Sequence, residues 1–170
     1  MSTDFGAQIL RCFIGFVLLA ACLGKLRTFA SFRANLATSF GVPPQLGGLL
    51  APAIVGIELL VAGLVLGPFP RFGMATALLL FTAFAMLLAW RLWRDGVVRC
   101  SCFGEAERSL SGYDLLRNLL IVAAIALFLT LPAAAGTPLP MSLLAAGLAA
   151  ILTVLAIDFH DVMHLLQAPR

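Results

Sequence analysis

Two cysteines one residue apart, Cys100 and Cys102, are the side chains of this sequence best suited to chemistry. They lie in the polar run Arg99-Cys100-Ser101-Cys102-Phe103-Gly104, between long apolar stretches. The thiolate is the reactive form of cysteine, and a neighbouring cation such as Arg99 favours it. A disulfide between residues i and i+2 is strained and therefore easy to reduce. The pattern indicates a redox dithiol; the alternatives are a soft-metal site, because thiolates select Cu(I) and Zn(II), and two incidental loop cysteines.

Glu58 is the second candidate, because it lies near the middle of the apolar run 49–66. A carboxylate at the centre of a bilayer costs at least about 2.5 kcal/mol and is expected to face the bundle interior with a partner. The candidate partners are Arg11, Lys25 and Arg117. A functional Glu58 would relay protons or orient a ligand, whereas a structural one would fix helix packing through an ion pair.

Two further groups of polar residues could support chemistry. Arg117 and Asn118 lie in the first turn of an apolar segment and are expected to face back toward the cysteines. His160 and His164 are four residues apart near the end of the chain. That spacing can bind a metal on a helix, but known motifs of this kind carry further ligands, and solvent-facing caps are the alternative.

Composition points to an integral membrane protein. The 170 residues are 62% hydrophobic and only 11% charged, with a mean hydropathy of +1.06, whereas soluble domains are about a quarter charged. The length suits one domain, 1–170. The net charge of +3 is small and no basic stripe is interleaved with aromatics, so nucleic acid is not an expected partner. The first apolar segment lacks a basic leader and is expected to be retained as a span.

The elements that must position the cysteines are helical spans. Segments of roughly 20 apolar residues predict transmembrane helices; they cover 5–26, 49–66, 72–93, 114–131 and 141–158, with a polar cysteine loop at 94–112. Residues 28–40 place Phe29, Phe32, Leu36 and Phe40 on one helix face, which predicts a short interfacial helix. We therefore expect an all-α membrane protein, with a four-helix transmembrane bundle plus a fifth C-terminal span and this interfacial helix.

Cys12 and Cys22 both lie in the first predicted span. They are about 15 Å apart along the helix axis and cannot pair with each other. They are expected to behave as small buried hydrophobes.

Basic residues divide unequally between the two ends of the predicted bundle. Nine lie at the end with the cysteines and only Arg11 and Arg71 at the other; the nine are Lys25, Arg27, Arg33, Arg91, Arg94, Arg99, Arg108, Arg117 and Arg170. By the positive-inside rule, this asymmetry predicts that the cysteine end faces the cytoplasm.

The sequence resembles the MauE family of methylamine-utilisation membrane proteins, within the wider DoxX-like group. The resemblance covers roughly residues 10–131 and is carried by Gly24-Lys25-Leu26, Glu58, Cys100-Ser101-Cys102-Phe103-Gly104 and Arg117-Asn118. It implies a redox-associated protein of the bacterial inner membrane that helps to mature a disulfide-rich methylamine dehydrogenase subunit. The implied partners are the lipid bilayer and a thioredoxin-like, MauD-type protein. The implied disulfide chemistry lies outside the cytoplasm, which conflicts with the distribution of basic residues.

The predicted architecture is also similar to the vitamin K epoxide reductase type, which uses a Cys-x-x-Cys pair with a quinone. Here the pair is one residue closer and no second loop pair is present, so a self-contained quinone relay is disfavoured. Three hypotheses follow from the sequence. The protein is a thiol-disulfide oxidoreductase component supported by Arg99, Arg117 and Glu58, a soft-metal carrier, or a non-catalytic scaffold.

Overall fold

The computed structural model describes residues 2–40, 42–95, 112–132 and 138–158. This part of the chain forms six helices and contains no strand: α1 (Ser2–Arg27), α2 (Phe29–Phe40), α3 (Pro44–Leu66), α4 (Pro70–Asp95), α5 (Gly112–Thr130) and α6 (Leu139–Ile157). Five of them, all except α2, are long and apolar enough to cross a membrane. The fold is therefore all-helical with five candidate spans, as the sequence predicts.

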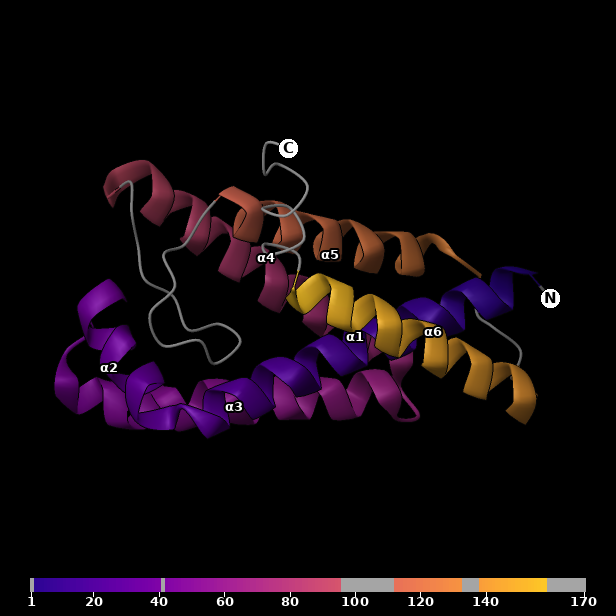
Figure 1. The fold of residues 1–170 in the computed structure, drawn as a ribbon, viewed down its shortest axis with the longest axis horizontal. Helices are drawn as coiled ribbons and strands as arrows, with labels where there is room; N and C mark the ends of the chain where they lie inside the picture. Colours follow the sequence, from indigo (N-terminus) through magenta and orange to yellow (C-terminus); the bar gives the residue numbers. More distant parts are fainter. Residues whose placement is uncertain (1, 41, 96–111, 133–137, 159–170) are drawn as a thin grey trace, which may run out of the picture.

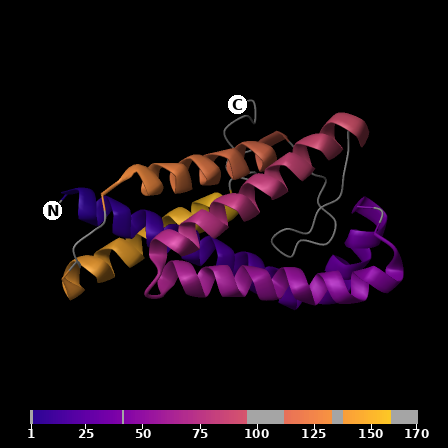
Figure 2. The same cartoon turned by 180° about the vertical axis from the view of Figure 1, so that it is seen from behind.

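Helix α1 lies at the centre of the arrangement (Figures 1 and 2). It packs most extensively against α6 and α3, and also contacts α5 and α2, while α4 packs against α3 and α5. The core lies between these helices and includes Ile14 and Val17 of α1, Val65 of α3, Met74 of α4 and Ile125 of α5, all fully buried. Because the outward faces carry exposed leucines throughout, lipid is the solvent that this surface requires.

Helix α6 contacts α1 through a face of small residues. Its buried residues are Ala145, Ala149 and Thr153, spaced four apart on one side of the helix. Small side chains let two helix backbones approach closely. In lipid the hydrophobic effect does not drive helices together, so this close packing is what favours their association. The other faces of α6 carry exposed leucines together with Ile151 and Val154.

Helix α3 begins at Pro44, earlier than the predicted start near residue 49. Pro43 is its N-cap and Pro44 occupies the first helical position, where the missing N–H costs nothing. The Pro43-Pro44 pair therefore starts α3 as well as ending the preceding segment. The additional residues of α3, 44–48, lie beside α2, since a Cβ at Gly47 would come within 3.8 Å of Arg33.

Helix α2 uses its predicted apolar face to contact other helices. Phe32 and Leu36 are buried in a cluster with Cys22 of α1 and with Ala51 and Val55 of α3. The position of α2 is thereby fixed beside the point where α1 and α3 face each other (Figure 1).

Two arginines satisfy helix C-termini at the end of the bundle away from α2. Arg11 of α1 donates from Nε to the carbonyl of Val65 (2.8 Å) and from Nη2 to the carbonyls of Leu66 (2.6 Å) and Gly67 (2.7 Å). Arg71 of α4 donates from Nη2 to the carbonyl of Leu131 (2.5 Å), just after α5. The last carbonyls of a helix have no intrahelical donor, and a cation there also complements the helix dipole.

A close approach of α3 and α4 yields the first prediction. A Cβ at Gly73 would overlap the backbone at Leu64 and Val65, whereas a Cβ at Gly63 would meet no atom within 4 Å. We expect Gly73→Ala to destabilise the protein by roughly 1–3 kcal/mol, because the two backbones must separate. The matched control Gly63→Ala should be neutral or slightly stabilising, by up to about 1 kcal/mol. Thermal unfolding in detergent, followed by far-UV circular dichroism, measures both; equal effects would contradict the packing described.

Candidate functional site

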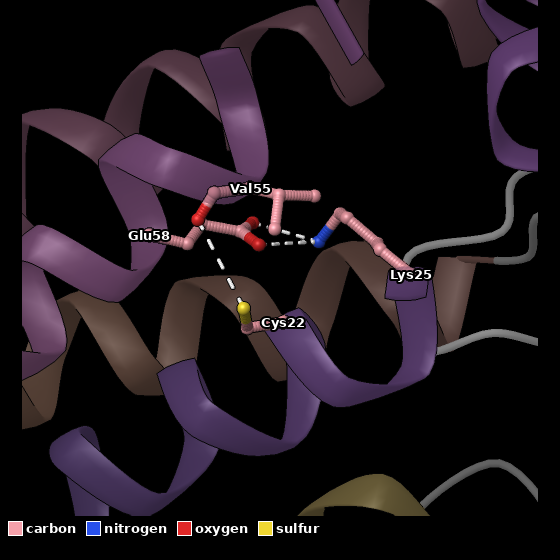
Figure 3. Close-up of polar contacts among 4 residues, drawn as sticks. All are labelled: Cys22, Lys25, Val55 and Glu58. Atoms are coloured by element: carbon pink, nitrogen blue, oxygen red, sulfur yellow. Dashed lines mark hydrogen bonds and ion pairs between the residues drawn. The ribbon is translucent and has the colours of Figure 1, made fainter. Parts of the chain in front are cut away.

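A buried ion pair joins α1 to α3 (Figure 3). Nζ of Lys25 lies 2.7 Å from Oε1 and 3.0 Å from Oε2 of Glu58, so the ammonium contacts both carboxylate oxygens. The two side chains are only 7% and 12% exposed. Of the three cations that the sequence offers to Glu58, Lys25 is the one that contacts it.

Each helix contributes two side chains or backbone groups, three residues apart, to the surroundings of the ion pair. Cys22 and Lys25 share one face of α1, while Val55 and Glu58 share the facing side of α3 (Figure 3). Helical side chains lean toward their own N-terminus, so the long Lys25 side chain reaches back along α1 to meet Glu58. The Sγ of Cys22 lies 3.9 Å from the carbonyl oxygen of Val55, within reach of a weak S–H hydrogen bond.

Helix α2 covers the ion pair from a third direction. The ring centroid of Phe32 lies 5.7 Å from Nζ of Lys25, a distance at which the face of an aromatic ring attracts a cation. Phe32 belongs to a buried apolar cluster that also includes Leu36, Ala51 and Val55. The buried Glu58 carboxylate is thus paired with a cation, which is what a buried carboxylate requires.

Chemically, this arrangement places a proton donor and a proton acceptor within hydrogen-bond distance in a site shielded from solvent. A proton could move between the two groups without any change of position. The same contact joins α1 to α3, and the contact of Phe32 with Lys25 adds α2.

Arg117 and Asn118 form a second buried polar group, at the beginning of α5. Nη2 of Arg117 lies 3.5 Å from Oδ1 of Asp114, and Nδ2 of Asn118 donates to the backbone carbonyl of Asp114 (3.2 Å). The carboxylate of Asp114 is in the first turn, where the helix dipole favours a negative charge. Both predicted residues therefore lie where α5 begins, at the junction with the cysteine-containing segment.

The remaining predicted site residues lie outside the described part of the chain. Arg99, Cys100 and Cys102 fall within 96–111, and His160 and His164 within 159–170. Within the described ranges, no group of three or more His, Cys, Asp or Glu side chains could hold a metal ion. Cys12 and Cys22 are free, buried thiols.

Sequence reasoning identified Glu58 and Lys25 but missed the contact of Arg11 and the contact of Phe32. It considered Arg11 as a partner of Glu58, whereas Arg11 donates to the carbonyls that end α3. The signal for this was the position of Arg11 near the start of α1, level with the Gly67-Pro68 turn if the two helices are antiparallel. The contact of Phe32 with Lys25 had no such signal, because it depends on how α2 folds back onto α3.

The ion pair yields the second prediction. Lys25→Met leaves the Glu58 carboxylate buried without its cation, so we expect a loss of roughly 3–5 kcal/mol in the free energy of unfolding. Arg27→Met, two residues along α1 at an exposed position, serves as the control and should change stability by less than about 0.5 kcal/mol. Unfolding in mixed micelles of increasing SDS content measures both variants. If Lys25→Met were as mild as its control, the pair would not stabilise the fold.

Comparison with known proteins places this chain in a family. The family model described as methylamine utilisation protein MauE matches residues 3–132 and so spans α1 to α5, including Lys25 and Glu58. No curated protein and no solved structure matches the chain. The match confirms the resemblance carried by the sequence motifs and covers about three quarters of the chain. With five helices able to cross a bilayer, the chain belongs to the MauE family as a multi-pass integral membrane protein associated with methylamine utilisation.

Proposed function

We propose that this protein is a thiol-disulfide exchange component of the bacterial inner membrane that acts in methylamine dehydrogenase maturation. Cys100 and Cys102 are the exchanging pair, and a thioredoxin-like protein of the MauD type is the partner. The family match over residues 3–132, which includes the Cys100-Ser101-Cys102 segment, is the observation that carries the proposal.

In the proposed exchange, a thiolate of the reduced pair attacks one sulfur of a partner disulfide. A mixed disulfide forms, the partner's S–S bond breaks, and the sulfur released takes up a proton. The second cysteine then attacks the mixed disulfide, so that Cys100 and Cys102 become the disulfide and the partner leaves as a dithiol. Two electrons pass to the partner, and the reverse exchange follows the same steps backward.

The described residues support this proposal because basic side chains flank the cysteine segment on both sides in the sequence. Arg91 and Arg94 lie in the last turns of α4, and Arg117 lies at the start of α5. Cations near a cysteine favour its thiolate, which is the attacking form. In this account α1, α3, α4 and α5 are the four-helix frame, held by the Lys25–Glu58 pair, and α6 is an added fifth span beyond the matched region.

The third prediction concerns trapping of the mixed disulfide. One of the two single variants, Cys100→Ser or Cys102→Ser, lacks the resolving cysteine but keeps the attacking one. That variant should accumulate a covalent complex with the thioredoxin-like partner. Non-reducing electrophoresis of co-expressed proteins detects the complex, which should disappear on reduction. Cys12→Ser and Cys22→Ser are matched controls, because both thiols are buried in α1, and neither should trap the partner. Full dehydrogenase maturation in the Cys100→Ser/Cys102→Ser double variant, with no trapping in either single one, would contradict the proposal.

The fourth prediction separates exchange from metal carriage. A dithiol that exchanges with a partner should purify without stoichiometric copper or zinc, measured by elemental analysis of protein prepared under reducing conditions. Stoichiometric metal that is lost in Cys100→Ser would instead show that the pair holds an ion.

A further inference from the structure

Both tryptophans of the chain lie in the last turns of α4, beside two arginines. Trp90 is 43% exposed and Trp93 is 86% exposed. Two guanidinium groups lie against the ring of Trp90: Cζ of Arg91 is 5.2 Å and Cζ of Arg94 is 5.0 Å from the ring centroid. Such contacts hold both cations at one place on the surface, at the end of a membrane-spanning helix.

The charge at this end of the bundle differs from that at the other end. At the far end, Arg11 and Arg71 donate to carbonyls that end α3 and α5. At the near end, Lys25 contacts Glu58 and Arg117 contacts Asp114. Three further basic residues that the structure describes at this end, Arg27, Arg33 and Arg94, are exposed, whereas Arg91 is half-buried. The acidic residues Asp95 and Asp158 also lie at this end. Exposed positive charge therefore gathers at the end where α4 terminates.

We propose that Trp90, Arg91 and Arg94 form a binding site for the phosphate of an anionic phospholipid headgroup. Guanidinium groups bind phosphate oxygens through paired N–H donors, and an indole ring is favoured at the level of the headgroups. Here both chemistries are present within little more than one turn of one helix. An anionic membrane surface attracts basic side chains that flank a span, so charge and position both fit this occupant. Arg91 and Arg94 also flank the cysteine segment in the function proposed above, but lipid binding at this site requires no thiol chemistry and is measured separately.

The site is directly measurable, because all tryptophan fluorescence of the chain arises from Trp90, in the site, and Trp93, three residues along the same helix. The full-length protein is reconstituted in vesicles of phosphatidylcholine and phosphatidylglycerol, with brominated acyl chains on one lipid at a time. Bromine quenches nearby tryptophan fluorescence. The ratio of the quenching by brominated phosphatidylglycerol to that by brominated phosphatidylcholine therefore reports which lipid occupies the site. We expect phosphatidylglycerol to be preferred by about fivefold or more. Arg91→Gln/Arg94→Gln should reduce this ratio to about one.

Controls separate a local site from a general charge effect. Arg27→Gln removes an exposed cation at the same end of the bundle but on α1, and it should retain the preference. Arg94→Gln alone is the second variant if the double variant does not fold, and it should lower the ratio at least twofold. No preference in the wild type, or equal loss in Arg27→Gln, would overturn the proposal. Loss of the preference on adding soluble glycerol phosphate at millimolar concentration would show that the site takes free phosphate instead of lipid.

Discussion

The contact between Lys25 and Glu58 is the interaction on which the arrangement of α1, α2 and α3 depends. Each charge alone would be costly inside an apolar bundle, because hydrocarbon offers neither water nor counterions. Together they form a neutral unit in which both carboxylate oxygens contact the ammonium. This requirement fixes the rotation and the relative height of α1 and α3, which hydrophobic contacts between leucine-rich surfaces would leave variable. Phe32 adds α2 to the same unit.

A second constraint acts at the helix ends. Backbone groups that lose their helical partners cannot be left unsatisfied at the edge of a bilayer. Arg11 meets this need for α3 and Arg71 for the end of α5, each from a neighbouring helix. At this end of the bundle, arginine side chains hold the helices together through backbone carbonyls. The opposite end carries exposed arginines and the points where α4 ends and α5 begins, between which the segment with Cys100 and Cys102 lies in the sequence. The architecture thus concentrates its polar chemistry at one end.

Much of this could be predicted from the sequence, because the lipid environment imposes simple rules. Runs of about 20 apolar residues indicate the five candidate spans, and a lone carboxylate such as Glu58 must have a partner. The identity of the partner was left open among Arg11, Lys25 and Arg117. The position of Arg11 near the start of α1 could have excluded it, but choosing Lys25 over Arg117 needs the relative height of the helices. The early start of α3 was missed because Pro43-Pro44 was interpreted only as a helix end. The geometry of Cys100 and Cys102 stays a prediction, since these residues lie outside the described ranges.

The central claim is that the Lys25–Glu58 contact, and not either charge by itself, holds the frame. Its most direct test is the interaction free energy from a double-mutant cycle that combines Lys25→Met with Glu58→Met. The account predicts that the double variant is within about 1 kcal/mol of the wild type, because two apolar side chains of similar size replace a neutral pair. Additive losses, with the double variant less stable than either single one, would contradict it.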